Sequence, residues 1–293
     1  MFIEGAGTFA AAQLFGCATA RREPVVRFGL VTDCHYADRN PWDDGVHRRY
    51  YRAAQGKLAE CVKVMNAARP DFLVELGDLK DKSGGEEGTL RNLDTIEAEL
   101  AKFEGPRYHV LGNHDEDAIS KSQFLSRVSN AGFPKALAHY SFSVNGVKFI
   151  VLDANFNADL SDYDHGNFDW RVAVLPPDQV RWLETELADG DSPAVVFCHQ
   201  RLDSDDELAV RNAPEVRRAL ERSGRVAAVF TGHHHAGGFS RINGIPYYTL
   251  PAVIEGPDAA DNAYAIASVD SSGGVSIVGY RKLAGDGVWK ERK

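Results

Sequence analysis

From Val25 onward, short apolar runs of strand length alternate with longer amphipathic runs of helical length. This alternation predicts a layered fold in which helices cover β-sheets, because each element must bury its apolar side against another element. Leu58, Val62 and Met65, for example, recur at helical spacing before Pro70 ends that helix. The predicted strands cover residues 26–32, 72–76, 107–111, 194–198 and 226–230, and the predicted helices cover residues 47–68, 90–103, 178–187 and 213–222.

Two parts of the chain depart from this alternation. Runs at residues 138–144 and 147–152 flank Asn145-Gly146, a dipeptide typical of a two-residue hairpin turn, so we expect an antiparallel pair there. The irregular stretch from Leu152 to Pro177 is long, which favours a lid or substrate loop over a plain connection. Residues 242–289 are rich in strand-like runs. The sequence therefore predicts an α/β (α+β layered) fold with antiparallel as well as parallel strands.

The length of 293 residues fits one large domain, which we place at residues 25–293. Residues 1–24 are predicted to be separate from it, because the first 20 are small and apolar and precede Arg21-Arg22, like the tail of an export signal. This predicts a periplasmic or other extracytoplasmic protein, with lipid attachment at Cys17 as one variant. The alternative is a cytoplasmic protein with a disordered or core-packed N-terminus. No other run has the ~20 apolar residues of a membrane-spanning helix.

The acidic balance of the chain limits its partners. A net charge of −9 and a pI of about 5.6 argue against long nucleic acid, because backbone binding needs a basic surface. A small phosphorylated substrate stays compatible with this charge, since bound metal ions reverse the sign of the local field. The four cysteines lack CxxC spacing, so neither a disulfide framework nor a zinc ribbon is indicated. No sequence feature indicates an oligomeric state.

Polar residues of metal-ligand type follow five of the strand-like runs. In an open α/β sheet the carboxyl ends of the strands border one crevice, so we expect these residues to converge there. Each fragment alone has an ordinary explanation, such as a Gly-Asp turn or a core histidine at His199. Turns and packing do not explain all five in this order. The fragments are Asp33-Cys34-His35, Gly77-Asp78, Gly112-Asn113-His114-Asp115, Cys198-His199 and Gly232-His233-His234-His235.

This ordered set resembles the signature of the calcineurin-like metallophosphoesterase family, over residues 26 to about 256. The resemblance implies a central β-sandwich of two mixed sheets flanked by helices, with a dimetal site at the strand ends, and a metal-dependent phosphoesterase activity. The implied ligands are Asp33, His35 and His235 for one metal and Asn113, His199 and His233 for the other, with Asp78 as the bridge and His114 as the acid beside the leaving group.

The residue types suit this chemistry independently of the family. Imidazoles and carboxylates favour two divalent ions of Mn, Fe or Zn over magnesium. A carboxylate shared by ions ~3.5 to 4 Å apart suits in-line displacement at phosphorus, with direct attack by a metal-bound hydroxide. No GxSxG or glycine-rich phosphate loop indicates a protein nucleophile. Asp115 is predicted to orient His114. A nuclease, or a binding protein with purely structural metals, is the weaker alternative.

A narrower resemblance concerns the substrate. The runs Phe28 to Asp33, Tyr36 to Asp38, Arg48 to Arg52 and Val253 to Gly256 are similar to the manganese-dependent ADP-ribose and CDP-alcohol diphosphatase branch of the family. The chain departs from that branch at His35, where the branch often carries Gln. The resemblance implies small nucleotide diphosphate-type or phosphodiester substrates. An alkaline-type phosphomonoesterase is the alternative.

Substrate contacts are predicted on three segments. Arg48 and Arg49 offer guanidinium forks to a phosphate remote from the metals, and the alternative is a solvated helix face. His234, between two implied ligands, is a third candidate for substrate binding. Side chains of the irregular stretch could stack on a base or sugar, or pack within the loop. They are Asn155, Phe156, Tyr163, His165, Phe168 and Trp170.

Overall fold

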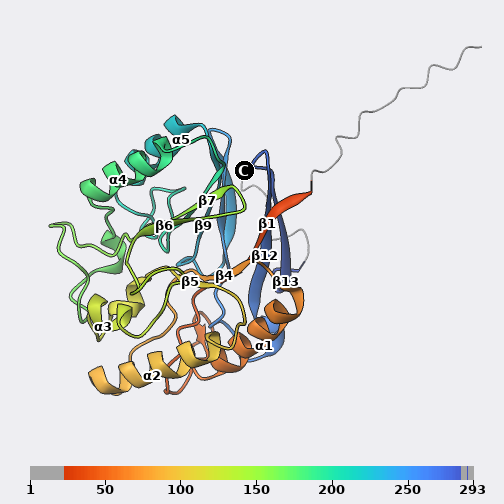
Figure 1. Cartoon of the computed structure of the whole chain (residues 1–293). Coiled ribbons are helices and arrows are strands. Elements are labelled where there is room, and N and C mark those ends of the chain that lie inside the picture. Colours follow the sequence, from red (N-terminus) through yellow and green to blue (C-terminus); the bar gives the residue numbers. More distant parts are fainter. Residues whose placement is uncertain (1–22, 285–288, 290–293) are drawn as a thin grey trace, which may run out of the picture.

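The computed structural model describes residues 23–284 and residue 289. Two mixed β-sheets pack face to face, and helices cover their outer faces (Figure 1). This four-layer arrangement confirms the predicted fold class. Residues 1–22, which hold nearly all of the predicted export segment, lie outside the described residues, so export stays a prediction. Within the described part of the chain, no helix combines the length and the apolar character needed to cross a membrane.

One sheet has five strands, which are β1 (Pro24–Val31), β4 (Phe72–Glu75), β5 (Arg107–His109), β12 (Ala263–Asp270) and β13 (Val275–Arg281). They lie in the order β13-β12-β1-β4-β5. Strands β1, β4 and β5 run parallel, whereas β12 is antiparallel to both of its neighbours. The carboxyl ends of β1, β4 and β5 therefore meet at one edge of the sandwich.

The second sheet has six strands, with the bounds β6 (Tyr140–Val144), β7 (Val147–Val151), β8 (Ala194–Phe197), β9 (Val226–Thr231), β10 (Gly238–Ile242) and β11 (Ile245–Thr249). Their order is β10-β11-β9-β8-β7-β6, and the four central strands are parallel. Strands β6 and β7 form the predicted hairpin. Asn145 and Gly146 at its turn both have positive φ, 50° and 80°, as a tight two-residue turn of this kind requires.

Phenylalanine rings fill the space between the two sheets. The ring of Phe28 lies 5.2 Å from Phe72 of its own sheet and 5.4 Å from Phe149 of the opposite sheet, centroid to centroid. Further apolar clusters lie between each sheet and the helices outside it. The helices are α1 (Ala53–Ala68), α2 (Gly85–Leu100) and α3 (Lys121–Leu125) on the five-stranded sheet, and α4 (Pro177–Ala188) and α5 (Ala213–Ser223) on the six-stranded sheet.

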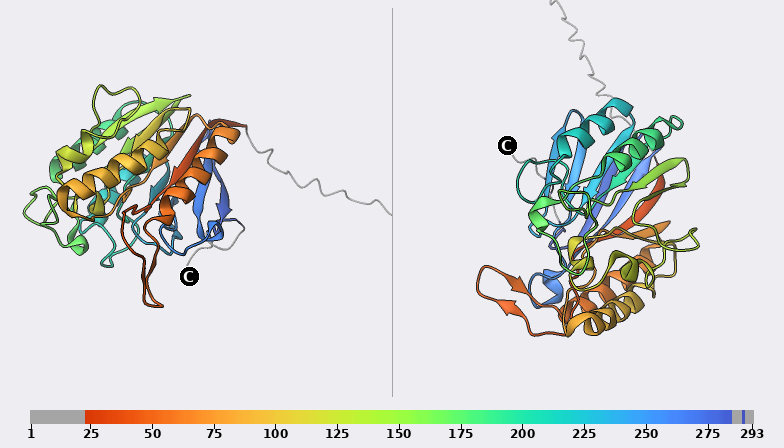
Figure 2. Two further views of the ribbon diagram at one scale, coloured as in Figure 1. Left: turned by 90° about the horizontal axis from the view of Figure 1, so that it is seen from below. Right: turned by 90° about the vertical axis from the view of Figure 1, so that its left-hand side faces the viewer.

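The segment before α1 differs from the sequence-based prediction of a helix from residue 47. Here β2 (Trp42–Asp43) and β3 (Arg48–Arg49) form a short hairpin that projects from the body of the protein (Figure 2). Its turn is stabilised by the Asp44 carboxylate, which accepts hydrogen bonds from the backbone amides of Val46 at 3.0 Å and His47 at 2.7 Å. The side chain thus offers the backbone an alternative to helix. The predicted helix is therefore wrong in its first six residues.

The second predicted helix, residues 90–103, is shifted in the structure. Helix α2 begins five residues earlier, at Gly85, and ends at Leu100. The stretch between β7 and α4 is irregular as predicted, with only a short 3-10 turn, η2 (Trp170–Val172). Two other short turns are η1 (Asn113–Glu116) and η3 (Ala259–Asp261).

Candidate active site

The seven predicted metal ligands follow parallel strands of both sheets, at the edge where these strands end. Because the two sheets face each other, their strand ends border the same crevice. Asp33 and His35 follow β1, Asp78 follows β4, Asn113 follows β5, His199 follows β8, and His233 and His235 follow β9.

The backbone is strained at four of these seven positions. Asp33, His35, Asp78 and His233 have positive φ values of 52°, 46°, 57° and 64°. Residues with a Cβ rarely adopt this region, and each such residue costs on the order of 1–3 kcal/mol. The rest of the fold must stabilise these conformations, and strain of this kind concentrates at functional sites.

Glycines precede several ligands because the chains that bear the ligands approach closely. A Cβ atom on Gly112 would lie 2.3 Å from both the backbone nitrogen and Oδ1 of Asp78. A Cβ atom on Gly232 would lie 2.2 Å from Thr32 Oγ1 and 2.7 Å from Asp33 Oδ2. The Gly-Asn-His and Gly-His sequences are therefore a steric requirement of this crevice.

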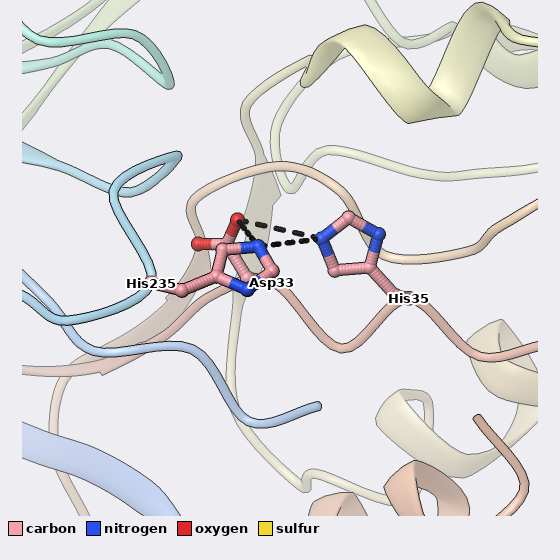
Figure 3. Close-up of side chains that lie close together, drawn as sticks. All are labelled: Asp33, His35 and His235. Carbon is pink, nitrogen blue, oxygen red and sulfur yellow. Dashed lines mark hydrogen bonds and ion pairs between the residues drawn. The ribbon is translucent and has the colours of Figure 1, made fainter. Parts of the chain in front are cut away.

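Asp33, His35 and His235 form one cluster (Figure 3). Asp33 Oδ1 lies 3.6 Å from His35 Nε2 and 3.5 Å from His235 Nε2, and the two Nε2 atoms are 3.1 Å apart. The other oxygen of Asp33 accepts hydrogen bonds from Thr32 Oγ1 at 2.7 Å and from the backbone amide of His233 at 3.1 Å. These bonds fix the carboxylate, so that Oδ1 faces the two imidazoles.

Asp78, His199 and His233 form a second cluster, in which one potential ligand atom per residue lies within 4.8 Å of the others. His199 donates from Nδ1 to the carbonyl of Leu76 at 2.8 Å, and its Nε2 lies 3.1 Å from Asp78 Oδ2. The same oxygen of Asp78 is 3.5 Å from His35 Nε2 in the first cluster. Asp78 is therefore placed between the two clusters, where a bridging ligand would stand.

Four predicted ligand atoms are buried and have no hydrogen-bond partner: Asp33 Oδ1, Asn113 Oδ1, His199 Nε2 and His233 Nε2. His199 Nε2 is near Asp78, but its geometry is not that of a hydrogen bond. A buried polar atom without a partner is costly and rare in folded proteins. Coordination of cations would satisfy all four atoms. The carboxylate, amide and imidazole donors therefore fit two divalent ions of the kind predicted.

The electrostatic environment also suits metal binding. Burial, together with the nearby His199 ring, lowers the pKa of His233 to about 3, so this imidazole is neutral and able to coordinate. At His199 burial acts in the same direction, but the Asp78 carboxylate outweighs it and raises the pKa to about 10. A cation that replaces this proton would satisfy the same carboxylate.

His114, the predicted acid, lines the crevice with 27% of its side chain exposed. Its Nδ1 lies 3.2 Å from Asp117 Oδ2, within hydrogen-bond distance, and 3.7 Å from Asp81 Oδ1. Burial lowers the pKa of His114, but Asp78, Asp117 and Asp81 outweigh burial and raise it to about 10. These carboxylates favour the protonated ring, which is the form that a general acid requires.

The prediction that Asp115 orients His114 is wrong. The two oxygens of Asp115 accept hydrogen bonds from the backbone amides of Gly112 at 2.9 Å and of Asp78 and Leu79 at 3.0 Å each. Asp115 thus joins the loops after β4 and β5. Asp117 is the carboxylate that orients His114, because it lies three residues after that histidine and so on the same side of the turn. Its other oxygen accepts a hydrogen bond from Lys80 Nζ at 2.8 Å.

A cleft of about 1020 Å³ opens over both clusters. Five predicted ligands contribute to its wall, as do the predicted substrate-binding residues Arg49 and His234. Arg48 is exposed and is not part of this wall, because successive residues of a strand point to opposite faces. Sequence reasoning missed several wall residues. These are Trp42, Val46, His47, Leu208, Glu255 and Lys282.

Only one of the six loop residues proposed to stack on substrate lies at this cleft. Trp170 lines it, with its ring 5.8 Å from that of His233. Tyr163 is fully buried and stacks on Phe168 at 4.2 Å, and the buried Asn155 side chain donates to the carbonyl of Leu111 at 2.9 Å. Packing within the loop therefore explains most of the aromatic residues of the stretch.

The sequence pattern of the family described as calcineurin-like phosphoesterase matches residues 26–237, well over half of the chain. The chain belongs to the calcineurin-like phosphoesterase family. The matched range contains all seven predicted ligands of this phosphoesterase and His114. The family predicted from the ordered motifs is therefore confirmed.

Relatives of this phosphoesterase are similar over most of their length. The manganese-dependent ADP-ribose/CDP-alcohol diphosphatase of Danio rerio is 27% identical over 291 residues, covering 80% of this chain and 89% of that protein. The Oryza sativa protein of the same name is 27% identical over 277 residues, covering 80% and 86%. A dimetal phosphatase structure from Danio rerio, 24% identical, has the same fold, with a TM-score of 0.76 over 89% of this chain and 98% of that one. The predicted enzyme class and metal dependence are confirmed.

Proposed function

We propose that this phosphoesterase hydrolyses small nucleotide diphosphates and phosphodiesters with two divalent metal ions. The observation that supports this most strongly is the convergence of seven ligand-type side chains, four of which aim a buried, unpartnered atom into the same crevice. Asp33, His35 and His235 would hold one ion, and Asn113, His199 and His233 would hold the other. Asp78 would contact both.

Such ions, when bound, act as Lewis acids that activate water and stabilise the negative charge on phosphorus oxygens. The protein itself supplies the acid. Asp117 binds Nδ1 of His114, so the proton for the leaving oxygen comes from Nε2. Lys80 holds Asp117 from the other side, and both side chains are nearly fully buried. The acid is thus held in one orientation before the substrate enters.

The wall of the cleft favours a substrate with a flat apolar group and a second phosphate. Trp42 and Trp170 line the cleft and are 43% and 38% exposed, which is unusual for indole rings. Exposed aromatic rings can stack on any nucleobase, and each such stack contributes about 1–3 kcal/mol to binding. Arg49 and Lys282 add positive charge to the same wall. The substrates in the names of the Danio rerio and Oryza sativa relatives combine these features.

The test is a screen of the purified protein after reconstitution with Mn²⁺, Fe²⁺ or Zn²⁺. We expect ADP-ribose, CDP-alcohols and bis(p-nitrophenyl) phosphate to be hydrolysed with higher kcat/KM than p-nitrophenyl phosphate. Trp42→Ala and Trp170→Ala should raise KM for the nucleotides about tenfold and leave p-nitrophenyl phosphate nearly unchanged. Faster hydrolysis of simple monoesters would instead support the alkaline-type phosphomonoesterase.

A further inference from the structure

Glu255 makes a short contact to one of the predicted metal ligands. Its Oε1 lies 2.6 Å from Nδ1 of His235, which is a short hydrogen bond of the kind that an ionised acceptor makes. An ionised carboxylate has no proton to give, so Nδ1 of His235 is the donor. The lone pair of a neutral His235 ring is therefore on Nε2, and this is the atom that faces Asp33 Oδ1 and His35 Nε2.

The backbone around Glu255 is held from three sides. The amide of Ile254 donates to the carbonyl of Asp33 at 3.0 Å, which ties the segment to the first metal ligand. On the other side, the backbone amide of Tyr50 donates to the carbonyl of Ile254 at 3.2 Å, and the amide of Gly256 donates to the carbonyl of Arg48 at 2.8 Å. The segment therefore pairs with the end of the hairpin that carries Arg49 and Trp42.

A buried lysine provides the third support. Lys57 of α1 is 4% exposed, and its ammonium donates to three backbone carbonyls, those of Val253 at 2.8 Å, Glu255 at 3.0 Å and Gly256 at 2.7 Å. Three carbonyl acceptors use all three protons of an ammonium group. This arrangement fixes the path of the chain on both sides of Glu255, and so the direction in which its side chain points.

We infer that Glu255 is a positioning residue for metal binding: it sets the tautomer and the ring orientation of His235, and the backbone pairing of its segment joins the substrate hairpin to that ligand. This inference rests on the proposed dimetal site. Carboxylates that orient a histidine ligand in this way strengthen metal affinity by about 10- to 100-fold. Removal of such a carboxylate weakens metal binding without taking away any ligand atom.

The test measures Mn²⁺ binding to the full chain by calorimetry, for the wild type, Glu255→Ala and Glu255→Gln. We expect the wild type to bind two Mn²⁺, and Glu255→Ala to bind one of them 10- to 100-fold more weakly, with an unchanged melting temperature after chelation. Glu255→Gln should lie between the two, because its amide oxygen still accepts from Nδ1. Saturating Mn²⁺ should restore most of the turnover of Glu255→Ala.

Glu104→Ala is the matched control, since Glu104 is an exposed acid that does not line the cleft, and it should leave both affinities unchanged. Two sites of wild-type affinity in Glu255→Ala would overturn the inference while leaving the dimetal site intact. Turnover that stays low at saturating Mn²⁺ would also overturn it, because Glu255 would then act on the substrate. A wild type that binds fewer than two ions of Mn²⁺, of Fe²⁺ and of Zn²⁺ alike would overturn the proposed function itself.

Discussion

Asp78 Oδ2 lies 3.1 Å from His199 Nε2, so a carboxylate from the five-stranded sheet meets an imidazole from the six-stranded sheet. The same oxygen lies 3.5 Å from His35 Nε2 of the first cluster. The site is thus assembled across the interface between the sheets, over the aromatic core that fixes their spacing. A rigid core of this kind holds ligands in place before any ion binds.

Replacement of the acid should affect substrates according to their leaving groups. We expect His114→Ala to keep both metals, and to lower kcat at least 100-fold for alkyl phosphate esters but much less for p-nitrophenyl esters, since a weakly basic leaving oxygen needs no proton. Steady-state kinetics on the two classes of ester check this. Equal losses for both classes would remove His114 from the role of acid.

Asp117 should act through His114. We expect Asp117→Asn to lower kcat for alkyl esters about tenfold with little change in KM, because the ring loses the anion at Nδ1 that stabilises its protonated form. The double variant with His114→Ala should be no slower than His114→Ala alone. Additive losses would show that Asp117 acts independently of this histidine.

Arg49 and Arg48 form a matched pair, since they are neighbours in β3 and only Arg49 lines the cleft. We expect Arg49→Ala to lower kcat/KM for ADP-ribose roughly ten- to a hundredfold, the loss of a charged hydrogen bond of about 1.5 to 3 kcal/mol, and to leave p-nitrophenyl phosphate nearly unchanged. Arg48→Ala should change neither substrate. If the two variants behave alike, the cleft wall does not select the second phosphate through Arg49.

The convergence of the predicted ligands could be anticipated from the sequence, because each one closely follows a strand. A strand is a local pattern, and the rule that carboxyl ends of parallel strands border one crevice then brings distant motifs such as Asp33 and His233 together. The hairpin at 138–152 was equally local, because Asn145-Gly146 specifies its turn.

The features that the sequence did not reveal depend on contacts that have no local signature. Arg48 and Arg49 precede a true helix, and the hydrogen bonds of Asp44 hold the chain before it in a hairpin turn, so that helix begins six residues later than predicted. Asp115 and Asp117 are the same residue type two positions apart, so only the η1 turn decides which of them faces His114. Glu255 contacts His235, although strands β10 and β11 separate the two residues along the chain.

A buried charge cluster behind the site should give the fold a pH-dependent stability. Burial lowers the pKa of His109, but Glu97 at 3.3 Å and Glu75 at 3.5 Å outweigh burial and raise it to about 10. Because the folded pKa exceeds the ordinary 6.5, the stabilisation is complete below pH 6.5 and is lost as the pH rises toward 10.

We therefore expect His109→Gln to lower the free energy of unfolding by several kcal/mol, roughly 3 to 5, at pH 6, because it leaves buried carboxylates without their cation, and by clearly less at pH 9.5. Urea unfolding at the two pH values measures both differences. His165→Gln, at an exposed histidine, is the control and should change stability little at either pH. A loss for His109→Gln that is equal or larger at pH 9.5 would contradict the assignment of a charged His109.

Asp78 is proposed to hold two catalytic metal ions together, and metal counting on the wild type and Asp78→Asn tests this role most directly. The measurement is elemental analysis of the bound metal after equilibration with excess Mn²⁺, alongside kcat for ADP-ribose and circular dichroism of the same samples. We predict two ions per chain in the wild type, and fewer than two in Asp78→Asn with an unchanged fold and a loss of turnover of at least 1000-fold, about 4 kcal/mol. Two tightly bound ions with near-normal turnover in Asp78→Asn would contradict the account.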